Sequence, residues 1–219
     1  MIIAFTQILE SRSGYIAPEL YTGDMFYWIN EAIREQVEAS FRQFEQSQRI
    51  TDDIRTLVIE ELAIATSHTA PSFTSDYLID RIDFPADYLY LLNHSSELRV
   101  ANSGDFDYTV TLGKREPNAG YTDYSTVRKR NKVAQHDDIH IMMRDPFNRT
   151  TSEFPLSTVS ENGINVYTDS TFIVNQVIVS YLTQPAEVSD AVDSDLPVFL
   201  HRKLVEMAVS KYLQQPTTA

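Results

Sequence analysis

Residues 172–183 are the segment that most restricts how this chain can fold. In the sequence FIVNQVIVSYLT, apolar side chains occupy both alternating sets of positions, so an extended strand here would be largely apolar on both faces. Such a strand needs apolar cover on each side, as a central strand in a packed core has. We therefore expect Phe172–Thr183 to be the central strand of a sheet.

Three further segments are rich in aromatic and β-branched residues and predict strands, namely 88–100, 108–112 and 164–168. The tripeptide Glu161-Asn162-Gly163 supplies turn residues immediately before the last of these. The predicted strands follow a helical region and precede one terminal helix, rather than alternating with helices. This order predicts an α+β fold with an antiparallel sheet or sandwich.

Helical periodicity dominates the first part of the chain. From Met25 to Phe44, apolar residues recur at steps of three and four after the N-cap candidate Asp24. A second helix is predicted to start at residues 51–53 and to continue through Leu62, although the segment 58–65 also has the composition of a strand. Two helices joined by a short polar link predict an N-terminal helical hairpin.

The C-terminal region predicts one more helix, over residues 196–213. An acid followed by Leu196-Pro197 is a typical helix start, because proline suits the first turn. Phe199, Leu200 and Leu204 would form its apolar face and pack back on the sheet or the N-terminal helices.

We expect a single α+β domain over residues 1–219, since the chain is long enough for one substantial core. Its parts would be a mainly helical region over 1–65, a mainly β region over 66–195, and the terminal helix. We find no internal repeat that would suggest a solenoid or an array.

The composition restricts the class of protein. Hydrophobic residues make up 42% of the 219 residues, with 12 Tyr and 11 Phe, as in chains with a packed core. Cysteine is absent, which excludes disulfides, thiolate metal sites and a cysteine nucleophile. No stretch approaches the roughly 18 apolar residues of a transmembrane helix, and no base precedes the N-terminal apolar run. We expect no membrane partner, and synthesis in a bacterial cytoplasm followed by assembly elsewhere.

The net charge of −13 is unevenly distributed. Residues 135–195 carry ten acids and two bases, whereas residues 71–134 carry nine acids and eight bases. An acidic chain is a poor ligand for nucleic-acid backbones, because affinity for phosphates comes from Lys and Arg. An acidic surface does suit the wall of a channel past which DNA slides without sticking.

A polar segment over residues 113–135 carries six of the 18 bases and is predicted to be a long loop. Three interpretations of it remain open: a nucleic-acid contact with interleaved aromatic and basic side chains, a solvated loop, or a tether to the acidic region of a neighbouring copy. Its candidate interface residues are Tyr121, Tyr124, Arg128, Lys129, Arg130 and Lys132.

The sequence His136-Asp-Asp-Ile-His140 is the nearest approach to a catalytic motif. Two histidines four residues apart on a helix share a face and can hold zinc. However, the zinc-protease motif has Glu where this chain has Asp137, and Glu161 is the only tolerable third ligand. In the alternative interpretation, the aspartates cap a short helix and the histidines form local hydrogen bonds. We expect no enzyme and no cofactor, with a metal-dependent hydrolase as the alternative.

Three stretches of the sequence resemble the connector ring proteins of tailed bacteriophages, most closely those of the crAss-like podoviruses. They are residues 23–58, residues 137–151, and the pair 172–188 with 195–209. In the first, a helix runs through a Phe-Glu-x-Ser-Gln-x-Ile step into an Asp-Asp-hydrophobic-Arg-x-Leu-Val segment. In the last, a strand ending in Tyr-hydrophobic-x-x-Pro precedes Asp-Leu-Pro and a helix that contains a histidine.

The resemblance implies a virion structural protein without a catalytic residue or cofactor. It implies a homomeric ring of twelve copies in the head-to-tail connector, between the portal and the tail. Such a ring contacts the portal and other tail rings and lines the DNA exit channel, where contact with genomic DNA is transient and non-specific. A non-viral cytoplasmic adaptor is the remaining alternative.

Overall fold

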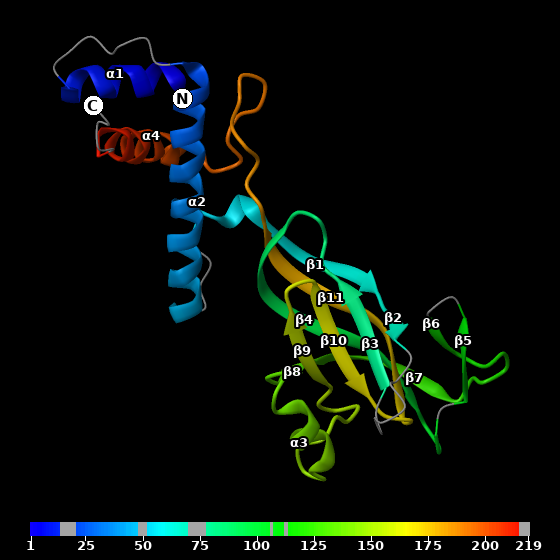
Figure 1. Ribbon diagram of the computed structural model, residues 1–219. Coiled ribbons are helices and arrows are strands. Elements are labelled where there is room, and N and C mark those ends of the chain that lie inside the picture. Colours follow the sequence, from blue (N-terminus) through cyan, green and yellow to red (C-terminus); the bar gives the residue numbers. More distant parts are fainter. Residues whose placement is uncertain (14–20, 48–51, 70–77, 106, 112–113, 215–219) are drawn as a thin grey trace. The chain divides into compact units, whose positions relative to one another are not determined.

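The computed structural model describes the whole chain except residues 14–20, 48–51, 70–77, 106, 112–113 and 215–219 (Figure 1). The fold is α+β, with helices at both ends of the sequence and strands between them. Where the sequence led us to expect a single domain, the chain divides into two compact units. The helical unit comprises residues 1–58 and 183–219, and the β unit comprises residues 59–182.

Three α-helices build the helical unit: α1 (Ile2–Ser13), α2 (Thr22–Ser47) and α4 (Val198–Leu213). Helix α4 packs against both α1 and α2. The Phe5 ring meets the Tyr212 ring edge to face, with 6.4 Å between centroids. At the same end of the unit, the Lys211 ammonium lies 2.8 Å from the Glu35 carboxylate.

Helix α2 follows the predicted period, since six of its seven predicted apolar face residues are buried and only Phe41 is half-buried. It begins at Thr22, so Asp24 lies in its first turn rather than at the N-cap. The predicted second helix is wrong. After a 3₁₀ turn, Arg55–Leu57, the chain enters strand β1 (Val58–Ala65), because β-branched Val58, Ile59 and Ile64 favour extended backbone.

The β unit contains two main sheets. The first has the order β1, β11, β4, β7, formed by Val58–Ala65, Phe172–Thr183, Tyr88–Ala101 and Tyr124–Arg130. The second has the order β2, β3, β10, β9, β8, formed by Ser67–Thr69, Leu78–Asp83, Gly163–Thr168, Leu156–Ser160 and Lys132–Val133. A separate hairpin pairs β5 (Tyr108–Thr111) with β6 (Lys114–Pro117).

The two main sheets are joined at two corners. The chain passes from β1 to β2 through Thr66 alone, and from β7 to β8 through Asn131 alone. Both corner residues are buried, and the Thr66 hydroxyl donates a 2.8 Å hydrogen bond to the Val174 carbonyl. The strand order therefore closes on itself, and the sheets enclose one core.

Strand β11 has the bounds and the central position that its sequence predicts, with β1 on one side and β4 on the other. Its residues on the inner face pack with Leu98 of β4 and with Ile82, Ile164 and Val166 of the second sheet. The predicted strands at 88–100, 108–112 and 164–168 are also present, within a residue or two of the expected ends.

The prediction of a long loop over residues 113–135 is wrong. Strands β6, β7 and β8 lie within it, and β7 pairs with β4 from Ser95↔Arg130 to Ala101↔Tyr124. The reason is alternation: Val127 packs on the core, while Arg128 and Arg130 point to the other side of the strand. The frequent charged residues led to the prediction of a loop, although a strand at the edge of this sheet needs apolar residues on one face only.

Helix α3 (Ile139–Arg144) covers the outer face of the second sheet. Its Ile139 belongs to a small buried cluster with Ala134, Leu156 and Tyr167, against which Met142 and Met143 also pack. This second cluster fixes the segment that follows β8.

The terminal helix allows a direct test of its predicted face. Leu200 and Leu204 are buried as expected, but Phe199 is 64% exposed, because it lies on the opposite side of the helix.

We predict that Leu204→Ala lowers the free energy of unfolding of the helical unit by roughly 2–5 kcal/mol, as truncation of a buried leucine does. Phe199→Ala is the matched control and should change it by less than about 0.5 kcal/mol. Urea denaturation measures both; equal losses would contradict the packing described.

Gly163 is required by a close backbone approach. A Cβ atom at this position would lie 2.0 Å from the Ile82 carbonyl oxygen of the paired strand β3. We predict that Gly163→Ala destabilises the β unit by about 1–3 kcal/mol, since the strands must separate. Gly23→Ala, in a helix with nothing within 4 Å of the new methyl group, should be neutral or stabilising. Thermal unfolding of the two variants compares them, and a neutral Gly163→Ala would be the contrary result.

Candidate interaction surfaces

The predicted interface residue Arg128 makes contacts within its own β unit. Its Nε atom donates a 2.9 Å hydrogen bond to the Ser95 hydroxyl, and its terminal nitrogen lies 3.0 Å from the Glu61 carboxylate. Glu61 belongs to β1, at the opposite edge of the sheet from β7. Arg128 thus lies across the outer face of the sheet instead of projecting from a loop.

Lys129 and Lys132 anchor the segment that runs from α3 to β9. The Lys129 ammonium lies 2.7 Å from the Glu153 carboxylate, and the Lys132 ammonium donates a 3.4 Å hydrogen bond to the Asn148 side chain. Of the six predicted residues, these two therefore hold a neighbouring surface segment. Arg130 is exposed and has no recorded acceptor among the described residues.

Tyr121 and Tyr124 lie at the start of β7 and form a pair. Their rings stack with 6.5 Å between centroids and 6° between planes, and the Arg99 guanidinium lies 5.7 Å from the Tyr124 centroid. Arg99 also forms a 2.8 Å ion pair with Glu116 of β6. These contacts join the small hairpin to the first sheet, so the tyrosines have a structural role that the sequence did not reveal.

The segment 145–155 is held by its own backbone contacts as well as by the lysines. The Asp145 carboxylate accepts hydrogen bonds from the Phe147 amide and the Asn148 side chain, and these, the amide first, lower the pKa of Asp145. The buried Thr150 hydroxyl donates to the Tyr167 carbonyl at 2.6 Å and accepts from the Leu156 amide at 3.1 Å. The segment is thereby fixed at both ends.

This fixed segment exposes large apolar side chains. Phe147 is 96% exposed, Phe154 68%, and Ile141 of α3 70%. We call these three residues the β-unit patch. A lone exposed apolar residue needs no explanation, but three large ones between residues 141 and 154 make this segment a candidate contact surface.

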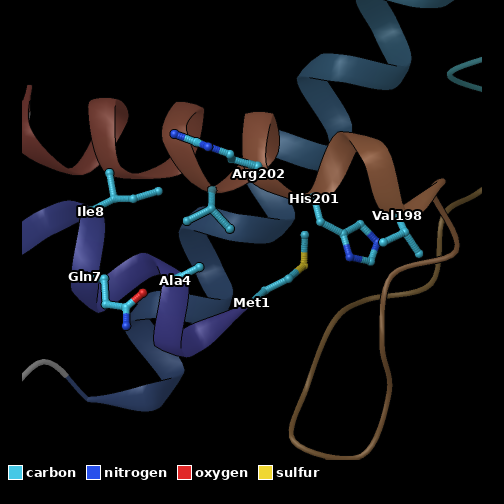
Figure 2. A pocket seen from close by; sticks show the side chains of 8 residues that line it. Met1, Ala4, Gln7, Ile8, Val198, His201 and Arg202 are labelled. Atoms are coloured by element: carbon cyan, nitrogen blue, oxygen red, sulfur yellow. The ribbon is translucent and has the colours of Figure 1, made fainter.

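The described part of the helical unit has several hollows, of which two are lined by exposed apolar side chains. The first, of about 530 Å³, lies between α1 and α4. Figure 2 shows Ala4 and Ile8 of α1 facing Val198, His201 and Arg202 of α4 across it. The His201 Nε2 atom lies 3.1 Å from the Leu196 carbonyl, and Arg202 forms an ion pair with Glu206, so both polar side chains already have partners at its edge.

The second hollow, of about 560 Å³, combines apolar and acidic side chains. We call it the acidic pocket. Its lining includes Ile3, Phe26, Asp190, Val192 and Asp193. Ile3 is 76% exposed and Val192 43%, and both aspartates are exposed.

The wall of the acidic pocket is anchored on α2. The Asn30 side chain accepts a 2.8 Å hydrogen bond from the Val188 amide and donates a 3.2 Å bond to the Val188 carbonyl. Arg34 lies 2.8 Å from the Glu187 carboxylate, and a turn is closed by the Ser189 amide donating to the Val192 carbonyl. The carboxylates of the pocket are therefore presented on a fixed segment.

The histidine motif does not form the predicted helix face. Helix α3 begins at Ile139, so His136 precedes it, and the His136 Nε2 atom lies 3.2 Å from the Val159 carbonyl. Asp138 occupies the N-cap position, but its side chain makes no capping hydrogen bond. Among the described residues, no three His, Asp or Glu side chains lie close enough to hold a metal ion.

Sequence reasoning missed the β-unit patch and the acidic pocket. The signal for Phe147 was present, since an aromatic residue in Asp-Pro-Phe-Asn-Arg stands outside any periodic apolar face. In the same way, Val192 is a single apolar residue in the acidic run Ser-Asp-Ala-Val-Asp-Ser-Asp.

Comparison with known proteins finds no matching family model and no curated protein of significant similarity. None of the helices in the described part of the chain has both the length and the apolar content to cross a lipid bilayer.

His94 links the region of Arg130 to the stability of the β unit. His94 is buried, its Nε2 atom lies 2.8 Å from the Ser157 hydroxyl, and burial, together with the charge of Arg130, lowers its pKa to about 4. In the unfolded chain it titrates near 6.5, so between these values only the unfolded state binds the proton. We predict that, as the pH decreases from above 6.5 to 4, the protonation of His94 in the unfolded chain lowers the free energy of unfolding by about 3 kcal/mol.

The variant His94→Gln isolates that contribution from the titration of carboxyl groups. Urea denaturation between pH 7 and pH 4 should give a steeper loss of stability for the original chain than for the variant. Parallel curves would show that His94 binds its proton at the same pH in the folded and unfolded states.

Proposed function

We propose that this chain is a structural subunit of the head-to-tail connector of a tailed bacteriophage. In this role it is a virion protein without catalytic activity, and about twelve copies form a closed ring. The ring joins the portal to the tail and surrounds the DNA exit channel. The resemblance of residues 23–58, 137–151 and the pair 172–188 with 195–209 to connector ring proteins names the class, and the surfaces described above support it.

The observation that carries the proposal is the exposure of apolar side chains on anchored segments. Phe147, Phe154 and Ile141 gain nothing from contact with water, and the segment that carries them is held by Lys129, Lys132 and Thr150 contacts. A rigid apolar surface loses little conformational entropy on binding a protein partner. A subunit that binds neighbouring subunits in an assembly needs such surfaces.

The basic residues favour protein contact over DNA contact. Arg128 and Lys129 are paired with Glu61 and Glu153, so a phosphate would have to displace a carboxylate that is already in place. The remainder of the chain is strongly acidic, with a net charge of −13. Weak, transient contact with passing DNA is consistent with that balance, whereas tight binding is not.

Assembly is the property to test. Electron microscopy and native mass measurement of the concentrated protein, alone and with the portal protein of the same virus, should show a closed ring. Twelve copies of the 25.0 kDa chain would have a mass of roughly 300 kDa. If the protein remains monomeric or dimeric in both conditions, and in virions as well, the connector proposal is wrong. Stoichiometric zinc in a monomeric preparation would favour the metal-dependent hydrolase instead.

A further inference from the structure

We propose that the β-unit patch of one copy docks in the acidic pocket of the next copy, an inference that rests on the proposed ring and specifies its interface. The occupant of the pocket is therefore the segment from Ile141 to Phe154 of a second copy of this chain. Three features support the pairing: apolar content on both sides, opposite local charge, and anchoring of both segments.

The apolar parts of the two surfaces suit each other. The patch offers two exposed phenyl rings and an isoleucine, and the pocket, of about 560 Å³, offers Ile3, Phe26 and Val192. An aromatic ring that enters such a hollow removes apolar area from water on both partners, and aromatic anchors in pockets dominate many interfaces.

The local charges are opposite. The two arginines of the segment that carries the patch, Arg144 and Arg149, are exposed, and no carboxylate pairs with them among the described residues. The same segment also carries the acids Asp145 and Glu153. Lys129 pairs with Glu153 and Lys132 contacts Asn148, so bases outnumber acids by four to two over the segment and its two anchoring lysines. On the other surface, Asp190 and Asp193 line the pocket beside its apolar residues. Complementary charge around an apolar centre selects the partner and its orientation.

Both surfaces are preorganised. Asn30 and Arg34 fix the wall of the pocket on α2, and Thr150 and the two lysines fix the patch on the β unit. Because the patch and the pocket are different surfaces of the same chain, each copy would use one surface toward each neighbour. Such a heterologous contact is the kind that closes into a ring.

Disulfide cross-linking tests the pairing directly, because the chain has no cysteine of its own. Phe147→Cys and Val192→Cys are made as separate variants, mixed under assembly conditions and oxidised. We expect covalent dimers from the mixture and not from either variant alone. The control mixes Phe147→Cys with Leu213→Cys, since Leu213 is 45% exposed and Val192 43%, and both belong to the helical unit.

A double variant carrying both cysteines extends the test. A heterologous contact should give a ladder of linked chains that ends at the size of the ring. Linkage confined to single chains, or dimers from Phe147→Cys alone, would overturn the pairing, because the first is intramolecular and the second isologous.

Charge exchange provides an independent measurement. Arg144→Glu with Arg149→Glu should raise the protein concentration needed for half-maximal assembly by about tenfold or more. Asp190→Lys with Asp193→Lys should do the same, and the two sets combined should restore assembly toward the original. The control variant carries Arg55→Glu and Asp52→Lys, which reverse the charges of an exposed ion pair far from both surfaces in the sequence. It should leave the concentration for half-maximal assembly unchanged.

The possible results distinguish a failure of the proposed interface from a failure of the proposed ring. Rings that form without the Phe147–Val192 cross-link and without charge-exchange rescue would show that the ring exists but uses other surfaces. Absence of any assembly, with or without the portal protein, would overturn both proposals. Cross-linking to the portal protein in place of a second copy would leave the ring intact and assign the pocket a different occupant.

Discussion

The β unit depends on the burial of strand β11 between β1 and β4. Strand β11 is hydrogen-bonded on both sides within its sheet, and the inner-face residues Val177, Val179 and Tyr181 are buried, whereas Gln176, Ile178 and Ser180 on the outer face are half-buried. The inner face is covered because β1 passes into β2 at Thr66 and β7 passes into β8 at Asn131, which brings the second sheet over the first. Ile82, Ile164 and Val166 of the second sheet then share one core with β11. Every surface segment of the unit is positioned by that enclosure.

Polar contacts hold in place the surface segments that expose apolar side chains. Lys129 and Lys132 contact the Glu153 and Asn148 side chains of the segment that exposes Phe147 and Phe154, and the Thr150 hydroxyl donates to the Tyr167 carbonyl of the sheet. Exposed ion pairs contribute little to overall stability, about 0–1 kcal/mol each, so their value here is positional. Asn30 has the same role beneath the acidic pocket, where both hydrogen bonds of its side chain go to the backbone of one residue, Val188.

The sequence was most informative where one physical requirement dominated. The two apolar faces of 172–183 predicted a central strand with its exact bounds, and the period of α2 predicted its buried face. It was misleading where two requirements competed. Over 58–65 the helical period and β-branching pointed to different structures, and the pairing with β11 decided the outcome. Over 124–130 the charges suggested a loop, although Val127 packs on the core and the strand pairs with β4 along its length. The surfaces around Phe147 and Val192 were not predicted, because exposure depends on tertiary anchoring by residues far away in the sequence.

Charge acts on two length scales in the proposed assembly. Both units are acidic and the whole chain carries −13, so two copies repel each other at distances where only net charge matters. That repulsion keeps a protein with a 96% exposed phenyl ring from associating at random. At physiological ionic strength the Debye length is about 8 Å, and within that range the local signs decide the interaction. Within that range, the exposed Arg144 and Arg149 of one copy and the pocket residues Asp190 and Asp193 of the next would attract each other in the proposed interface, although the two whole chains repel each other.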